Sequence, residues 1–313
     1  MSDVHQVLRA ILEPGFFSSS SVQVAAVIGA IVALVSGGLG VFTVIRGQAF
    51  AGEALGDLGA AGGSSAYLIG IAPLWGFIGV AVAAAGVMEL IGIQRERGRD
   101  LATGIVLGAG FGFAALFLYL GTTYHSTTGA AITILFGSIF ALSSTMIPLV
   151  LAFGVIALGI VVALYRPLLL SSVSPELAAA RGIPVRLVGG LYLLAMALAV
   201  ALSAVTIGAI LSTALLVGPA ATALRLTAKP GRAIITAGLL GLAAIWLGIL
   251  LAYDSYYWPP QRHGWPVSFF VVTLILIAYL LAGRLPARGG IRGRQVPPPH
   301  TAGAGAAVPG SGG

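Results

Sequence analysis

The chain has 313 residues, of which 58% are hydrophobic and only 8% are charged, and its mean hydropathy is +1.04. A soluble domain usually carries about 25% charged residues, so this composition excludes a soluble globular protein and indicates a polytopic membrane protein. The formal net charge of +7 does not indicate nucleic-acid binding, because the Arg residues lie in short loops between apolar stretches. The absence of cysteine excludes a disulfide framework and a thiolate metal site.

Residues 1–21 are expected to form an N-terminal segment outside the cytoplasm. They contain Asp3, Arg9 and Glu13 and a break at Pro14-Gly15, without an uninterrupted apolar core before a small-residue cleavage site. A cleavable signal peptide needs such a core. We therefore expect the membrane spans themselves to direct insertion.

Nine apolar stretches are candidate transmembrane helices, each of which needs about 20 residues to cross a bilayer. They are residues 22–45, 51–71, 73–93, 101–121, 145–165, 187–205, 207–226, 232–252 and 266–283. The second is the weakest, because it is short, rich in glycine and contains two acids. The apolar stretch 129–142 is too short to cross alone, so we expect a half-helix or an interfacial helix there. Fusing the two segments that meet near 203–208, or counting 129–142 as a span, would give eight or ten spans.

The fold class that follows is all-α, a polytopic bundle of about eight to nine transmembrane helices between residues 22 and 283. The positions of the basic residues predict its orientation. They occur at Arg46, 95–99, 166–186, 225–232 and from Arg284 onward. With nine spans and the N-terminus outside, all of these loops are cytoplasmic, as the positive-inside rule requires. The opposite loops, 122–144 and 253–265, contain only Arg262. The Pro- and Gly-rich tail 284–313 is then a disordered cytoplasmic segment.

Glu53 and Asp57 are two of only nine acidic residues, and they lie four positions apart within the second apolar stretch. Residues i and i+4 share one face of a helix. A carboxylate at bilayer depth costs about 2.5–3.5 kcal/mol, and two neighbouring carboxylates cost more unless a proton or a cation lies between them. The pair therefore predicts a cation site. The alternative is a helix end in water, where both acids are solvated.

The loop between the fifth and sixth stretches predicts a short helix at about residues 174–182. Ser174 suits the N-cap, Pro175 the first helical position and Gly182 the C-cap, and Pro184 blocks continuation. Such a helix of about two turns in the cytoplasm suits a knob that docks into a partner protein. The alternative is an interfacial linker helix.

Three segments, in this order, resemble the permease subunits of bacterial zinc, manganese and iron ABC importers. Arg46 with Phe50-Ala-Gly-Glu-Ala-Leu-Gly-Asp-Leu-Gly-Ala-Ala-Gly62 is similar to the family's Arg…Phe-x-Gly-Asp-Ala-Leu-Ser-His-Ala-x-x-x-Gly. Ser174-Pro-Glu-Leu-Ala-Ala-Ala-Arg-Gly182 is similar to its coupling helix, Asp-x-Glu-x-Ala-x-x-x-Gly. Val205-Thr-Ile-Gly-Ala-Ile-Leu-Ser-Thr-Ala-Leu-Leu-Val-Gly-Pro-Ala-Ala-Thr-Ala223 is similar to Val-Gly-x-Leu-Leu-x-x-Ala-Leu-Leu-x-x-Pro-Ala-Ala-x-Ala. The resemblance extends from about residue 20 to 283.

The resemblance implies a permease of the type II ABC importer fold in a bacterial cell membrane. Two copies would form a homodimeric pathway, fed by an extracytoplasmic metal-binding protein and energised by a cytoplasmic ATPase dimer. The ATPase would dock on a coupling helix whose matching residues are Ser174, Pro175, Glu176, Ala179 and Gly182. The chain has no Gly-x-x-x-x-Gly-Lys-Ser/Thr phosphate loop, so it is not expected to be the ATPase itself.

The resemblance also assigns the site. The family's Asp falls on Glu53 and its His on Asp57, so the potential ligands become all oxygen, which suits harder ions such as manganese better than zinc. The divalent ion would be the substrate, and no permanently bound cofactor is expected. Gly208 and Pro219 are assigned to the pathway or a hinge; Pro219 could equally be a kink that neighbouring helices tolerate.

Two other classes of protein remain as alternatives. An ATP-independent secondary transporter with a carboxylate proton site would show inverted repeats with paired broken helices, whereas the sequence has one acidic broken segment and no clear counterpart. An intramembrane enzyme would need a nucleophile–base pair or a His/Asp metal cluster at depth. None of the four histidines lies within an apolar stretch, which argues against that class.

Overall fold

The computed structural model describes residue 16 and residues 19–91, 99–125, 128–256 and 264–284. These residues form helices and short connections. The long helices are α2 (Ser20–Ile45), α3 (Ala49–Leu68), α4 (Pro73–Ile91), α5 (Arg99–His125), α7 (Ile147–Ala163), α10 (Val185–Ile207), α11 (Ala209–Leu226), α12 (Pro230–Ser255) and α13 (Val267–Arg284). The short elements are α6 (Thr128–Phe136), η1 (Ile139–Ala141), η2 (Ser144–Met146), α8 (Tyr165–Val173) and α9 (Pro175–Ala180). The expected N-terminal segment, apart from residues 16 and 19–21, and the tail after residue 284 lie outside the described residues.

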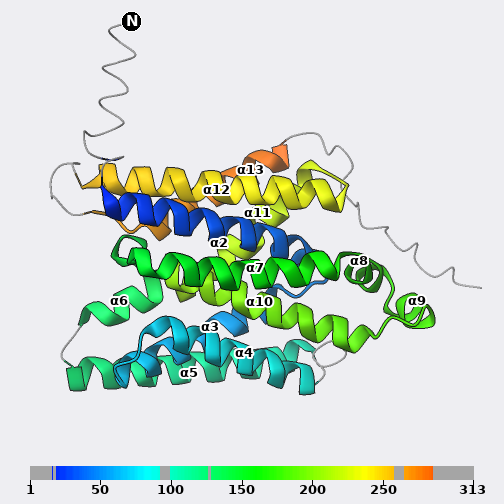
Figure 1. The fold of residues 1–313 in the computed structure, drawn as a ribbon, viewed down its shortest axis with the longest axis horizontal. Coiled ribbons are helices and arrows are strands. Elements are labelled where there is room, and N and C mark those ends of the chain that lie inside the picture. The colour runs from blue at the N-terminus through cyan, green and yellow to red at the C-terminus, as the bar shows by residue number, and fades with distance from the viewer. Residues whose placement is uncertain (1–15, 17–18, 92–98, 126–127, 257–263, 285–313) are drawn as a thin grey trace, which may run out of the picture.

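The long helices run side by side along the longest axis of the molecule (Figure 1). Helices α2, α11, α12 and α13 pack together on one side, α3, α4 and α5 pack together on the other, and α7 and α10 lie between them. The short helices α8 and α9 stand together at one end of the bundle. The predicted all-α bundle is therefore confirmed.

Among the described residues, eight helices are long and apolar enough to cross a membrane, and α3 is the predicted span that is missing from them. Helix α3 has 20 residues, which gives a length of about 30 Å. Its glycines, serines and two acids lower its hydropathy, but most of its residues are buried against α4, α5, α10 and α11. Neighbouring helices thus shield a helix that would be too polar to face lipid alone.

The structure also shows the two stretches, 129–142 and 203–208, for which the sequence left the number of spans open. The stretch predicted as a half-helix contains α6, which has nine residues and cannot cross a membrane alone, followed by η1. Helices α10 and α11 are separate, because Gly208 between them has φ 93° and ψ 155°, a conformation that is open only to glycine.

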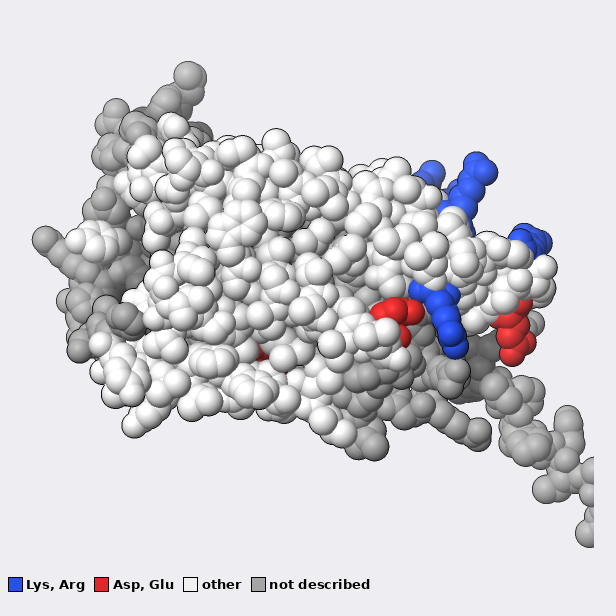
Figure 2. Space-filling model, turned by 60° about the horizontal axis from the view of Figure 1, so that its bottom comes forward, with Lys and Arg blue, Asp and Glu red and all other residues white. Residues whose placement is uncertain are grey.

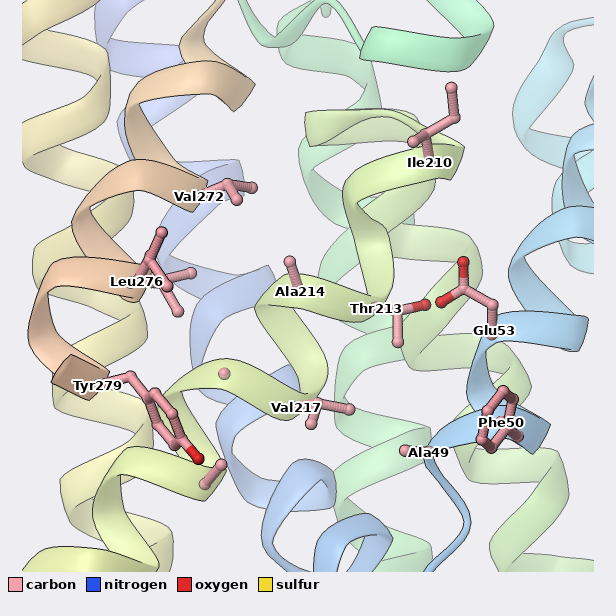
Figure 3. A pocket seen from close by; sticks show the side chains of 13 residues that line it. Ala49, Phe50, Glu53, Ile210, Thr213, Ala214, Val217, Val272, Leu276 and Tyr279 are labelled. Atoms are coloured by element: carbon pink, nitrogen blue, oxygen red, sulfur yellow. The ribbon is translucent and has the colours of Figure 1, made fainter. Parts of the chain in front are cut away.

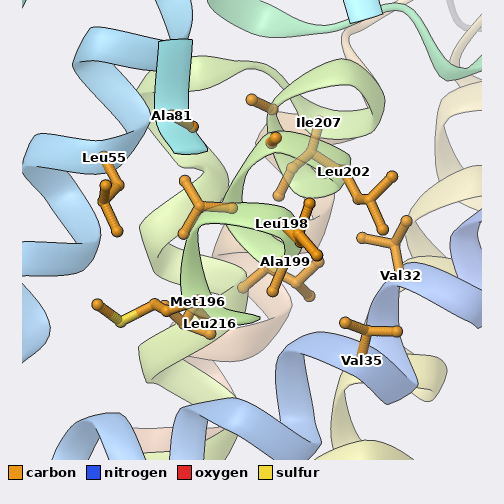
Figure 4. Packing of buried hydrophobic residues seen from close by; sticks show 14 of the residues in the cluster. Val32, Val35, Leu55, Ala81, Met196, Leu198, Ala199, Leu202, Ile207 and Leu216 are labelled. Carbon is orange, nitrogen blue, oxygen red and sulfur yellow. The ribbon is translucent and has the colours of Figure 1, made fainter. Parts of the chain in front are cut away.

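The core surrounds α10, most of whose residues are buried. Figure 4 shows its side chains Met196 to Ile207 meeting Val32 and Val35 of α2 and Leu216 of α11. Polar groups inside this core are paired. The Ser36 and Ser203 hydroxyls lie 2.9 Å apart, and Tyr192 donates a hydrogen bond of 3.0 Å to the Leu39 carbonyl. These pairs fix the register of α10 against α2.

Glycines allow the closest helix crossings, as the abundance of small residues predicts. A Cβ atom on Gly37 of α2 would lie 2.6 Å from the backbone nitrogen of Gly238 in α12. Gly40 of α2 faces the Leu216 carbonyl of α11 with no room for a side chain. The backbones of α2, α11 and α12 therefore touch directly.

The described basic side chains gather at one end of the bundle. In the view of Figure 2, the Lys and Arg side chains of the described residues lie at the end where α8 and α9 are. The described basic residues are at the ends of helices there, among them Arg46 after α2, Arg186 at the start of α10, Lys229 before α12 and Arg284 at the end of α13. The described basic residues thus lie together at one end, while the predicted basic residues at 95–98 and after Arg284 lie outside the described residues.

Candidate metal pathway

Helix α3 begins immediately after a tight corner that follows α2. Gly47 has φ 61°, and the Gln48 amide donates a hydrogen bond of 2.9 Å to the Thr43 carbonyl. Gln48 is the N-cap residue of α3 and is only 3% exposed. This corner places Glu53 in the second turn of α3 and Asp57 one turn further into the bundle.

Glu53 lines a cavity of about 600 Å³ between α3, α11 and α13. The other lining residues are Ala49, Phe50, Ile210, Thr213, Ala214, Val217, Gly218, Ala221, Val272, Ile275, Leu276 and Tyr279. Almost all of them are apolar. In Figure 3 the Glu53 carboxylate and the Thr213 hydroxyl point toward one another at the side of the cavity formed by α3 and α11. The two groups together offer oxygen ligands in otherwise apolar surroundings.

Asp57 is much more deeply buried than Glu53. Its exposed fraction is 2%, and its Oδ2 atom is buried without a hydrogen-bond partner among the described residues. Gly110 of α5 packs so closely that a Cβ atom there would lie 3.2 Å from the Asp57 Cβ. Buried carboxylate oxygens are costly unless they are paired, so Asp57 calls for a proton or a cation. This burial argues against the alternative of two solvated acids at a helix end.

The two acids do not form a closed metal centre. No group of three or more His, Cys, Asp or Glu residues lies close enough to hold a metal within the described part of the chain. Two carboxylates with a hydroxyl nearby are a small set of protein ligands. A resident metal would normally have more protein ligands.

The short helix predicted at about residues 174–182 forms as α9, which spans Pro175–Ala180 at the basic end of the bundle. The Ser174 hydroxyl accepts a hydrogen bond of 3.3 Å from the Leu177 amide, which is the N-cap contact that the sequence predicts. Pro175 and Glu176 occupy the first turn, and Gly182 ends the segment with φ 76°. Leu177 is 60% exposed, and Ala179 is also exposed. This helix therefore presents an exposed face beyond the end of the bundle.

Gly208 and Pro219 occupy different parts of α11. Gly208 precedes its first residue and contacts the backbone of Phe136 at the end of α6. The Ser268 hydroxyl of α13 donates a hydrogen bond of 2.9 Å to the Phe136 carbonyl. Pro219 is buried inside α11, directly after Gly218 of the cavity lining, and the helix continues through it. Only Pro219 is thus adjacent to the cavity, while Gly208 forms a joint with α6.

Comparison with known proteins now decides the family. The family model described as "ABC 3 transport family" matches residues 18–282. The chain belongs to the ABC 3 transport family. It is accordingly the membrane permease of an ABC transport system, and ATP hydrolysis belongs to a different subunit.

The matches to relatives of this ABC 3 permease cover 71–88% of its length. It is 33% identical over 270 residues to the manganese transport system membrane protein MntC of Halalkalibacterium halodurans, covering 85% of this chain and 88% of that protein. It is 26% identical to the high-affinity zinc uptake system membrane protein ZnuB of Haemophilus influenzae, covering 72% of this chain and 87% of that protein. The structure of PsaBC from Streptococcus pneumoniae in complex with a Fab has a TM-score of 0.73 and 25% identity, covering 88% of this chain and 95% of that chain.

A second solved structure shows the same fold at lower identity. It is an inward-facing metal-chelate type ABC transporter, with a TM-score of 0.69 and 14% identity over 90% of this chain and 96% of that chain. At this identity the likeness concerns the fold alone.

Sequence reasoning missed two residues near the cavity of the permease. Tyr279 of α13 lines the cavity, and the Arg225 guanidinium of α11 lies 3.7 Å from the centre of its ring and hydrogen-bonds its hydroxyl. In the sequence, Arg225 is recognisable only as one of the basic residues that predict the orientation. The sequence signal was an aromatic residue close to the basic end of the last apolar stretch, which by itself indicates only interfacial anchoring.

Proposed function

We propose that this ABC 3 permease moves a divalent metal ion into the cell and that Glu53 and Asp57 coordinate the ion during passage. The observation that carries the proposal is the buried, unpartnered Asp57 Oδ2 one helical turn from Glu53, which lines the cavity. A divalent cation between the two carboxylates would compensate their mutual repulsion and the lost hydration of Asp57. Without a cation or a proton, both costs would remain.

Manganese is the first candidate for the ion. Carboxylate and hydroxyl ligands suit Mn²⁺, whereas imidazole suits Zn²⁺, and the nearby potential ligands are the oxygens of Glu53, Asp57 and Thr213. The names of the MntC relatives, which include one in Listeria monocytogenes at 30% identity, also support manganese. ZnuB, named for zinc uptake, is a more distant relative at 26% identity.

The proposed assembly contains a second copy of the permease, a cytoplasmic ATPase dimer on α9 and a metal-binding protein on the opposite face. A second copy is supported by the apolar side chains beside Glu53, since Phe50 is 68% and Leu276 is 54% exposed. The exposed Leu177 and the first-turn Glu176 of α9 suit a docking contact with the ATPase. The basic end supports a multi-pass orientation in the bacterial cell membrane with the N-terminus outside and the C-terminus in the cytoplasm.

The test is ATP-driven uptake in proteoliposomes that contain the permease, its ATPase and its binding protein, with Mn²⁺, Zn²⁺ and Fe²⁺ offered separately. We expect uptake of Mn²⁺ in the wild type and its loss in the double variant Glu53→Gln/Asp57→Asn. Glu89→Gln is the matched control, because it neutralises an acid on α4 that does not line the cavity. Normal uptake in the double variant at equal protein content would contradict the proposed site.

The ATP-independent alternative makes a different prediction for the same vesicles. A secondary transporter would accumulate the ion with a proton gradient and no ATPase. Membership of the ABC 3 transport family argues against that behaviour. Uptake that requires the gradient and ignores ATP would restore the alternative.

A further inference from the structure

Arg46, at the corner between α2 and α3, connects this corner to α8, the helix that precedes α9. One of its terminal nitrogens donates hydrogen bonds to the hydroxyl oxygens of Ser171 at 3.1 Å and Ser172 at 3.5 Å, both in α8. Its Nε donates to the Gln48 side-chain oxygen at 3.3 Å. The guanidinium also lies 5.5 Å from the centre of the Tyr192 ring in α10. Arg46 therefore contacts three elements from a half-buried position.

The hydrogen-bond directions at this corner are mutually consistent. The Ser171 and Ser172 hydroxyls donate their protons to the Leu168 carbonyl, at 3.1 and 2.6 Å. Their oxygens are thereby left to accept from Arg46, which has donors and no acceptor. A planar guanidinium can reach acceptors on two different elements at once, which a lysine ammonium does less well. The geometry is specific to arginine rather than to any positive charge.

The residues that accept hydrogen bonds from Arg46 lie close in the chain to Glu53 on one side and to α9 on the other. On one side Gln48 caps α3, and its carbonyl accepts a hydrogen bond of 3.1 Å from the Gly52 amide, next to Glu53. On the other side Ser171 and Ser172 lie in the last turn of α8, and the Ser174 amide continues that helix with a bond of 3.0 Å to the Leu170 carbonyl. Ser174 is also the N-cap of α9. Few residues therefore separate Arg46 from either Glu53 or the exposed face of α9.

We propose that Arg46 is a positioning residue that transmits movement of the α8–α9 segment to α3 and so sets the position of Glu53. This inference rests on the proposed function, in which α9 receives the ATPase and Glu53 contacts the ion. Arg46 itself touches no ion. When α9 moves, the bonds from Arg46 to α8 and to the α3 cap make the start of α3 move with it, because both partners are parts of continuous helices. Loss of Arg46 separates ATP hydrolysis from transport.

The test measures ATP hydrolysis and Mn²⁺ uptake on the same reconstituted complex and compares uptake per ATP. We expect Arg46→Met to lower this ratio roughly tenfold, a typical size for coupling between two sites, while hydrolysis persists. Arg46→Lys keeps the charge but not the planar fork, so its ratio should be intermediate. Arg232→Met is the matched control, because it removes an exposed basic residue from the same end of the molecule, and its ratio should equal that of the wild type. An unchanged ratio in Arg46→Met overturns the proposal, as does an equal loss in Arg232→Met.

A second variant covers the case in which Arg46→Met does not assemble. Ser171→Ala/Ser172→Ala removes the two hydroxyls that accept from Arg46, together with their hydrogen bonds to the Leu168 carbonyl, and leaves the basic residue in place. We expect a lower ratio here too, and a ratio equal to that of the wild type overturns the proposal.

A structural readout separates this inference from the proposed function. The chain contains no cysteine, so spin labels can be placed at Phe50→Cys on α3 and Leu276→Cys on α13, across the cavity. ATP binding by the complex should change the distance between the labels in the wild-type background and not in Arg46→Met. The same response in both backgrounds overturns the role of Arg46, whatever ion is transported. If the complex moves none of the three ions while Arg46 still controls this distance, the cargo assignment fails and the coupling role stands.

Discussion

At the scale of single residues, Asp57 is unusual because it is 2% exposed and its Oδ2 atom lacks a hydrogen-bond partner among the described residues. A residue kept for packing alone would not need a charge there. Burying an unsatisfied polar group typically costs about 1–3 kcal/mol. Such a cost is tolerated at functional sites, where a ligand compensates for it.

This cost leads to a prediction about stability. Asp57→Ala should not destabilise the metal-free permease in detergent, because it removes a buried oxygen, Oδ2, that has no hydrogen-bond partner among the described residues. Mn²⁺ at one hundred times its dissociation constant should stabilise the wild type by about 2.7 kcal/mol and leave the variant unchanged. Thermal unfolding with and without Mn²⁺ measures both effects. Equal stabilisation of the two proteins by Mn²⁺ would remove Asp57 from the site.

The sequence predicted the identity of these residues but not their surroundings. Acids within an apolar stretch indicate a site, and the spacing of four places Glu53 and Asp57 on one face of a helix. It does not say that Glu53 lines a cavity with α11 and α13 while α5 covers Asp57. The hydrogen-bond partners of Arg46 could not be predicted from the sequence either. Ser171 is 125 positions away in the chain, and only the tertiary fold brings the two residues together.

At the scale of elements, the crossing of α2 and α11 depends on Gly40. The Leu216 carbonyl of α11 occupies the space that a side chain at position 40 would need. This atom belongs to the backbone of a helix that also contains Pro219, so it cannot move aside as a flexible side chain could. The missing amide of Pro219 already removes one hydrogen bond from that helix, which leaves less to hold it if α2 is pushed away.

Gly40→Ala should therefore destabilise the permease, by about 1–3 kcal/mol if the strain resembles that of overpacked cores. The control is Gly79→Ala on α4, where an added Cβ meets no atom within 4 Å. In that variant alanine replaces glycine at an open helical position and should be neutral or slightly stabilising. Thermal unfolding in detergent compares the two variants. Equal midpoints would show that α2 and α11 can separate without cost.

The elements differ in how far local sequence determined them. Helix α9 was predictable because its cap, its first-turn proline and its terminal glycine all act within one short segment. The sequence does not predict helix α8, because the fifth apolar stretch ends at residue 165 and Arg166 and Pro167 then indicate a loop. The break between α10 and α11 was visible as a turn near Gly208, but its contact with α6 depends on the packing of the whole bundle.

At the scale of the whole molecule, the difference between nine predicted spans and eight apolar ones comes from α3. A hydropathy average treats each helix as if it faced lipid, whereas α3 is largely covered by other helices. The fold can include this more polar helix because its surface contacts protein and not lipid. This arrangement also explains how Asp57 comes to lie in a membrane protein without facing the bilayer.

The separation of charge along the bundle predicts the orientation of the molecule in the cell. With α8, α9 and the basic helix ends in the cytoplasm, Leu177→Cys on α9 should react with a membrane-impermeant maleimide only after the cells are permeabilised. Tyr124→Cys, near the opposite end of α5 and 74% exposed in the wild type, should react in intact cells. The absence of native cysteine makes the unmodified chain a clean blank for both. The reverse labelling pattern would place α9 outside the cell, where no ATPase could reach it, and would contradict the proposed assembly together with the route from α9 through Arg46 to Glu53.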